Sequence, residues 1–335
     1  MKEISCKFDD ILIEASELLC HTSRLANNYE PDIEYVKQHK SSIPGCNSFI
    51  RIEHKETLPF INMANASIKR KLKYFMSSAK RKSENDLGEQ LIYDARHIFN
   101  GNMAHLVQHH LTALGLFNDK LGYGKDDISI VLDGCPSKMA IQAFNIIGYN
   151  VILSDGPVKG NIISITDCEF FHLLPYVNSL DIDFLKGNQV EKIFVSRKNT
   201  RKIINECEIN GVLKNEGFQK FYFEDMSIIE QWSLMRHASE VVGIHGAALG
   251  CMAFNKQNIS GGRVKLIELF GSGFVVNPFR KFIAVLQGHW VGCRGKITQE
   301  VIRDIDIPGM SKKHAFDDFE LDPKVLEIAL SLEKS

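Results

Sequence analysis

The chain has 335 residues, of which 44% are hydrophobic and 24% are charged, and its formal net charge is −1 at pH 7. This length predicts two domains of about 150 residues each, and the composition is typical of a globular protein. The absence of a basic excess argues against a nucleic-acid partner, and no run approaches the roughly 18 apolar residues of a membrane span. The first ten residues include acidic side chains where a signal peptide is apolar, so we expect a cytoplasmic location.

Eight cysteines are scattered along the chain without a C-x-x-C pair. This spacing favours reduced thiols over a disulfide scaffold or a zinc site, so no metal is expected.

Residues 1–60 show no clear periodic element. The stretch Lys69–Lys82 then places seven Lys and Arg side chains around Tyr74–Met76. It is either a solvated helical face with a loop, or a docking surface for an anionic acceptor or a peripheral membrane contact.

From about residue 100, helical and strand patterns alternate. Apolar residues recur at helical spacing over 103–117, and a further helix is expected over 137–147, ending at Gly148. Strands are expected at 128–133, 151–155, 162–165, 192–197, 218–223, 240–244 and 264–269, and helices at 202–215, after Ser227 and at 323–332. Strands separated by helices indicate an α/β fold with parallel sheets and right-handed crossovers. Residues 181–190 are the expected linker between two such blocks.

A glycine-rich run, Gly243–Cys251, follows the expected strand at 240–244. Small residues allow a ligand to approach the backbone, and the free N–H groups at a helix N-terminus attract anions. The turn His245, Gly246, Ala247, Ala248 and Leu249 is therefore a candidate phosphate-binding site, although such a run can also be only a tight strand–helix connection.

A second expected strand, 192–197, ends in a cluster of cations. Ligands of open parallel sheets bind at the carboxyl ends of the strands, where Arg197, Arg201, the glycine-rich turn and Glu268 are expected. Two arginines and a helix N-terminus could neutralise a diphosphate without a metal, and Glu268 could hold the hydroxyls of a ribose. The alternative is that the arginines are surface residues of a helix N-terminal turn.

The motifs of the second block occur in a characteristic order. They are Phe194–Arg197, Arg201–Glu206 with Glu208, Gly217-Phe218, Ser227 with Glu230-Gln231, and Val241–Leu249 with Phe254. In this order they resemble family 61 glycosyltransferases, strongly over residues 190–270 and weakly elsewhere. Ala248 stands where many relatives have glycine, which slightly restricts the approach of a ligand to the backbone.

The resemblance implies a GT-B architecture, in which two Rossmann-like domains face a cleft. It implies an acceptor-binding domain over 1–180 and a nucleotide-sugar-binding domain over 190–320. A C-terminal helix within 321–335 could pack back toward the first domain. It also implies an inverting transfer from a UDP-sugar to a glycan or glycolipid acceptor, with UDP-xylose slightly favoured over UDP-N-acetylglucosamine.

The stretch Gly101–His109 resembles the helix that carries an inward histidine in the N-terminal domain of this family. His105 and His109 are spaced i and i+4, so they are expected on one helical face. A neutral imidazole with a pKa near 6.5 can accept the acceptor's hydroxyl proton, which makes His109, or else His105, the candidate base. Asp94 and Asp133 are rival bases, and a polar surface or a two-histidine metal site are the other interpretations.

The sequence therefore predicts a UDP-sugar-dependent glycosyltransferase for surface or glycoprotein glycans that needs no cofactor or divalent metal. A non-catalytic nucleotide-sugar-binding homologue remains an alternative. A nucleotide-sugar epimerase or dehydrogenase is less favoured, because it would carry an early G-x-G-x-x-G after its first strand.

Overall fold

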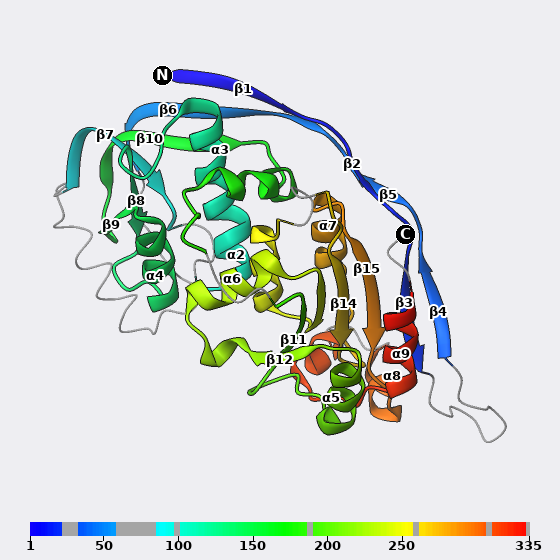
Figure 1. Ribbon diagram of the computed structural model, residues 1–335. Helices are drawn as coiled ribbons and strands as arrows, with labels where there is room; N and C mark the ends of the chain where they lie inside the picture. Colours follow the sequence, from blue (N-terminus) through cyan, green and yellow to red (C-terminus); the bar gives the residue numbers. More distant parts are fainter. Residues whose placement is uncertain are drawn as a thin grey trace. The chain divides into compact units, whose positions relative to one another are not determined.

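Two α/β units, each built on its own β-sheet, make up the protein (Figure 1). The computed structural model describes residues 1–21, 33–57, 85–96, 101–185, 190–256, 261–305 and 310–332. The first unit contains residues 1–9 and 45–182, and the second contains residues 10–44 and 183–335. The basic stretch Lys69–Lys82 lies outside the described residues.

The first unit contains a six-stranded sheet in the order β1-β6-β10-β7-β8-β9. Its strands are β1 (Lys2–Phe8), β6 (Cys46–Glu56), β7 (Asn85–Asp94), β8 (Ile128–Leu132), β9 (Asn150–Leu153) and β10 (Val158–Thr166). Strands β10, β7, β8 and β9 run parallel to one another, whereas β6 is antiparallel to both β1 and β10. The predicted parallel sheet is therefore present, with an antiparallel edge that the sequence did not indicate.

The helices of the first unit begin and end largely at the expected signals. They are α2 (Met103–His105), η1 (Leu106–Leu111), α3 (Thr112–Leu121), α4 (Lys138–Ile147) and η2 (Phe170–Ser179). In α4 the Ser137 side chain caps the Ala140 N–H, and Gly148 ends the helix at φ +94°, which is unstrained only for glycine. The segment predicted as one helix over 103–117 instead passes through a π-helical turn, η1, which lies between α2 and α3.

The second unit contains a seven-stranded sheet in the order β12-β11-β13-β14-β15-β3-β4. Its strands are β3 (Ser16–His21), β4 (Ile33–Gln38), β11 (Lys192–Ser196), β12 (Gln219–Tyr222), β13 (Glu240–Ile244), β14 (Lys265–Phe270) and β15 (His289–Arg294). All neighbours are parallel except β3 and β4. Counted from β11, the first five strands have the doubly wound order 2-1-3-4-5.

Helical segments connect these strands. They are α5 (Glu206–Asn215), η3 (Phe223–Asp225), α6 (Ile228–His237), η4 (Ala247–Phe254), α7 (Pro278–Val285), α8 (Gln299–Ile305), η5 (Met310–Phe316) and α9 (Pro323–Ser331). Helix α6 opens with the predicted capping box between Ser227 and Glu230. The helix predicted after the glycine-rich turn is a 3₁₀ helix, η4, whose residues from Leu249 to Phe254 are all buried.

The N-terminal region differs most from the expectation. Residues that showed no periodic element form nested antiparallel pairs: β1 with β6, β2 (Ile11–Ile13) with β5 (Ser41–Ile43), and β3 with β4. Residues 10–44, expected in the first domain, belong to the second unit because β3 pairs with β15.

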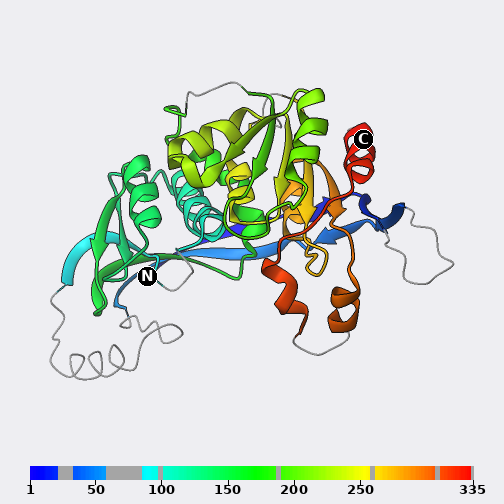
Figure 2. The same cartoon turned by 90° about the horizontal axis from the view of Figure 1, so that it is seen from below.

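Helix α9 contacts α5, β15 and β3 within the same second unit, and Figure 2 shows α9 beside that sheet. Buried residues of α9, including Val325 and Leu326, join the apolar core formed with Phe194 and Ile267. Among the described helices none is long and apolar enough to cross a membrane. None of the eight cysteines, all of which are described, forms a disulfide.

Candidate functional site

The order of strands in the second unit identifies one switch point at its carboxyl edge. The chain passes from β11 to β12 on one side and from β13 to β14 on the other, so the connections diverge between β11 and β13. Ligands of open α/β sheets bind at such a switch point. Arg197 follows β11 directly, and His245 follows β13 directly, so both residues flank it.

Two guanidinium groups converge on one backbone carbonyl at this edge. Arg197 Nη1 donates to the His245 oxygen at 3.3 Å, and Arg201 Nη1 donates to the same oxygen at 2.9 Å. Arg201 Nε also donates to the Ala315 oxygen at 2.5 Å. Among the described residues no carboxylate pairs with either guanidinium, and burial together with the charge of Arg197 lowers the pKa of Arg201. Two adjacent cations without an acidic partner favour the binding of an anion.

Arg201 is held in an unusual conformation. Its φ is +58°, a region that residues other than glycine rarely adopt. Its guanidinium lies over the ring of Phe316, 4.8 Å from the centroid, and over that of Phe274 at 5.7 Å. Such strained residues persist where the surroundings fix them, and they cluster at ligand sites.

The glycine-rich turn brings the backbone against Arg197. A Cβ atom on Gly246 would lie 2.7 Å from Arg197 Nη1, so the close contact requires glycine. Ala247 and Ala248 are half-buried and open the first turn of η4, where backbone N–H groups lack carbonyl partners within the helix. Leu249, also predicted as a ligand contact, has a fully buried side chain, and its N–H donates to the Gly246 oxygen.

Glu268, the predicted ribose contact, is held by neighbouring side chains. Its side chain is fully buried in the middle of β14, and both carboxylate oxygens are already bonded. His245 Nδ1 lies 2.6 Å from Oε1, and Trp290 Nε1 donates to Oε2 at 2.7 Å. The Glu268 carboxylate therefore positions the His245 ring and bonds to Trp290 within the core.

Glu268 determines which nitrogen of His245 is available. Burial raises the pKa of Glu268, and the hydrogen bond from His245 opposes this increase. The indole N–H of Trp290 can only donate, so an ionised Glu268 accepts from both neighbours, and we assign a proton to His245 Nδ1. Nε2 is then the nitrogen left for a ligand, on a ring stacked against Phe270 with centroids 5.4 Å apart.

His105 and His109 lie in the first unit and share one face, as predicted. Their rings stack with centroids 5.5 Å apart, and His109 also contacts Phe170 at 4.6 Å. Burial and then the charge of His105 lower the pKa of His109 to about 4. The expected pKa near 6.5 is therefore wrong: His109 is neutral at pH 7 and can accept a proton, but it is a weak base.

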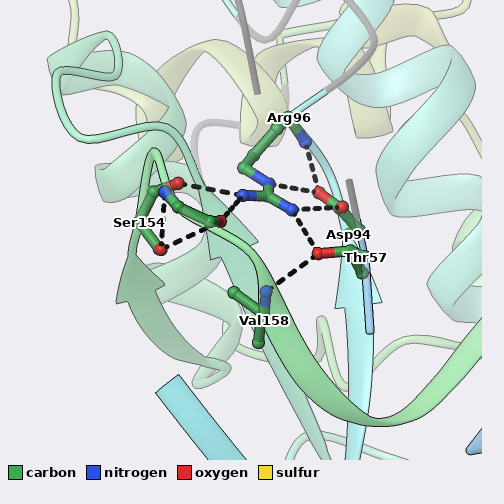
Figure 3. A network of polar contacts seen from close by, with 6 residues as sticks. Thr57, Asp94, Arg96, Ser154 and Val158 are labelled. Atoms are coloured by element: carbon green, nitrogen blue, oxygen red, sulfur yellow. Dashed lines mark hydrogen bonds and ion pairs between the residues drawn. The ribbon is translucent and has the colours of Figure 1, made fainter. Parts of the chain in front are cut away.

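The rival base Asp94 is held by a buried arginine (Figure 3). Arg96 donates through Nε to Asp94 Oδ1 at 2.8 Å and through Nη2 to Oδ2 at 2.7 Å. The same guanidinium donates to the backbone oxygens of Ser154 and Gly156 and to Thr57 Oγ1. This network holds Asp94 in an ion pair with Arg96, whereas the Asp133 carboxylate accepts from the Cys135 N–H.

Two cavities of the second unit, of about 210 Å³ and 670 Å³, are both lined by Ser16 and His289. Neither includes Arg197, Arg201 or His245, so the candidate site is defined by strand order and charge. No group of three or more His, Cys, Asp or Glu side chains within the described ranges is arranged to hold a metal ion.

The fold defines the second unit as an open, doubly wound α/β domain with a cationic carboxyl edge. The family model described as Glycosyltransferase 61 matches residues 105–260, which include both candidate histidines, both arginines and the glycine-rich turn. This stretch belongs to the glycosyltransferase 61 family, which confirms the resemblance predicted from the motifs and supports glycosyltransferase activity. No curated protein matches the chain.

Three residues of the site were missed by sequence reasoning. They are aromatic residues from other segments of the chain. Trp290 donates to Glu268, the Phe274 ring contacts the His245 ring, and the Phe316 ring covers Arg201. No sequence pattern near Phe316 indicates its contact with Arg201, because η5 lies outside the alternating pattern of strands and helices.

Proposed function

We propose that this protein transfers a sugar from a UDP-sugar to a hydroxyl of a glycan acceptor, with inversion at the anomeric carbon. The observation that carries the proposal is the convergence of Arg197 and Arg201 on the His245 carbonyl at the switch point of the sheet, with no acidic partner among the described residues. UDP-xylose is the favoured donor and UDP-N-acetylglucosamine the second, in the synthesis of surface or glycoprotein glycans.

In the proposed reaction the acceptor oxygen bonds to the anomeric carbon while the bond from that carbon to the UDP β-phosphate oxygen breaks. Arg197, Arg201 and the first amides of η4 stabilise the negative charge that develops on the leaving diphosphate. His109, His105 or Asp133 takes the hydroxyl proton of the acceptor. The GT-B arrangement of the two units and the independence from divalent metal are parts of the same proposal.

A UDP-release assay with a panel of UDP-sugars tests this function. The expected result is release that depends on an acceptor, survives EDTA and is strongly reduced in Arg197→Ala. Lys202→Ala is the matched control, because Lys202 is a nearby exposed cation that already pairs with Asp318. Acceptor-dependent release that is abolished by EDTA and restored by Mn²⁺ would contradict the metal independence.

A non-catalytic nucleotide-sugar-binding homologue is the second candidate. Two observations favour it: the pKa of His109 is lowered to about 4, and Asp94 is held by Arg96. Such a protein would bind UDP through Arg197 yet release none from any UDP-sugar, with or without an acceptor.

A further inference from the structure

An exposed aromatic ring lies beside the candidate diphosphate site. Phe316, in η5, is 64% exposed, whereas Phe184, the other exposed phenylalanine among the described residues, is 38% exposed. Exposing an apolar ring of this size costs free energy, so its position calls for a functional explanation.

Phe316 is fixed rather than free. Its backbone oxygen accepts a hydrogen bond from the Arg201 N–H at 3.4 Å, and the preceding Ala315 oxygen accepts from Arg201 Nε. On the other side of Ala315, the buried His314 ring lies between Asp304 and Asp317 at 2.9 and 2.7 Å. The chain therefore holds the ring in place before any ligand binds.

The ring shares Arg201 with the diphosphate site. Its face covers the guanidinium of Arg201, which also donates to the His245 carbonyl at the glycine-rich turn. A ligand whose phosphates bind Arg201 is thus brought next to a largely exposed aromatic ring. In a nucleoside diphosphate a single ribose separates the phosphates from a flat aromatic base.

We propose that Phe316 stacks on the nucleobase of the donor. This inference rests on the proposed function, because it takes a nucleoside diphosphate as the ligand of the arginine site. An aromatic side chain stacks on any base through its π face, and Arg201 beneath the ring strengthens the platform by a cation–π contact. Phe316 therefore contributes affinity for the nucleoside, while Arg197 and Arg201 contribute affinity for the phosphates.

Calorimetric titrations of the full chain with UDP and with inorganic pyrophosphate separate the two contributions. Phe316→Ala should weaken UDP binding by about 5-fold to 150-fold, the range for base–aromatic stacking, and leave pyrophosphate binding unchanged. Phe316→Tyr, which keeps a π face, should bind both ligands as the wild type does. Phe184→Ala is the control for removal of an exposed ring elsewhere.

A second measurement uses Phe316→Trp, whose added fluorescence should be quenched by UDP and not by pyrophosphate. Equal weakening of both ligands in Phe316→Ala would overturn the proposal, since the ring would then act only by ordering Arg201. UDP binding that depends on Arg197 but not on Phe316 would also overturn it, while leaving the proposed function intact. Failure of the wild type to bind UDP at all would overturn both.

Discussion

Arg201 and His245 lie 44 positions apart in the chain, yet the Arg201 guanidinium donates to the His245 carbonyl oxygen over 2.9 Å. This bond joins the segment after β11 to the turn after β13, the two strands between which the sheet reverses its order. Arg197 completes the arrangement with a second bond to the same oxygen. The cations are thus placed by backbone contacts, and no described residue accepts from their remaining N–H groups, which can bind an anion.

Replacement of Arg197 tests that availability. Arg197→Ala should weaken UDP binding by about 1.5–3 kcal/mol, the contribution of a hydrogen bond to a charged group, which is about 10-fold to 150-fold in dissociation constant. Isothermal calorimetry measures the change, and Lys202→Ala should bind UDP normally. An unchanged affinity in a folded Arg197→Ala protein would remove Arg197 from the site.

The Glu268→Gln variant should show whether Glu268 contributes to the stability of the fold or to the binding of UDP. Glutamine can still accept from Trp290, but its amide group donates to His245 Nδ1 and so moves the ring proton to Nε2. We therefore expect UDP affinity to fall while the midpoint of thermal unfolding is maintained or increased. A large loss of stability with normal UDP affinity would show that Glu268 serves the core alone.

The difference in stability between the wild type and Glu268→Gln should depend on pH, and its direction can be predicted. Burial raises the pKa of Glu268 above that of the unfolded chain, so ionisation in the folded state costs stability. The wild type should lose stability relative to Glu268→Gln as the pH rises from the ordinary range of a glutamate through the raised pKa. Thermal unfolding of both proteins across this range measures the difference.

If His109 is the base, its lowered pKa determines the pH profile. A base must be unprotonated, so turnover should fall only as the pH drops toward about 4. His109→Ala should reduce turnover by about 10²-fold to 10⁴-fold and leave UDP affinity unchanged. His105→Ala removes a neighbouring charge and should move the acid limb to higher pH. Near-normal turnover in both alanine variants would direct attention to Asp133.

The stability that His314 contributes to η5 should depend on pH. Hydrogen bonds to Asp317 and Asp304 raise the pKa of His314, while Lys313 competes for Asp304 and also pairs with Glu300. The stabilisation is present below the unfolded pKa of about 6.5 and is lost as the pH rises through the raised value. Wild type and His314→Gln should therefore differ in thermal unfolding at pH 6 and converge at alkaline pH. A constant difference would mean that His314 acts by packing alone.

The parts of the fold that were predicted correctly have local signals. Ser137 and Gly148 bound α4, and the capping box at Ser227 opens α6, so a few neighbouring residues determine each boundary. Strands β8, β11 and β14 are almost continuous buried runs, which is typical of parallel sheets.

The rest depends on contacts that no local pattern encodes. Strands β1 to β6 are defined by pairing with one another and with later strands, β6 with β10 and β3 with β15. Glu268 looked like a ligand residue because its partners, His245 and Trp290, are 23 and 22 positions away. Sequence reasoning therefore located the carboxyl edge of the sheet but not which side chains there face a ligand.

Gly243, within β13, and Gly246, in the turn that follows, should respond differently to alanine. At Gly246 a methyl group would lie 2.7 Å from Arg197 Nη1, so Gly246→Ala should displace that guanidinium and weaken UDP binding without unfolding the protein. At Gly243 it would lie 2.5 Å from the buried Leu249 side chain, so Gly243→Ala should cost about 1–3 kcal/mol of unfolding free energy by overpacking the core.

Gly211, inside α5 with open space around it, is the control, and Gly211→Ala should stabilise the helix by about 0.5–1 kcal/mol. Chemical denaturation and UDP calorimetry on the three variants measure both quantities, and a Gly246→Ala protein that binds UDP as tightly as the wild type would show that the contact with Arg197 does not position the cation.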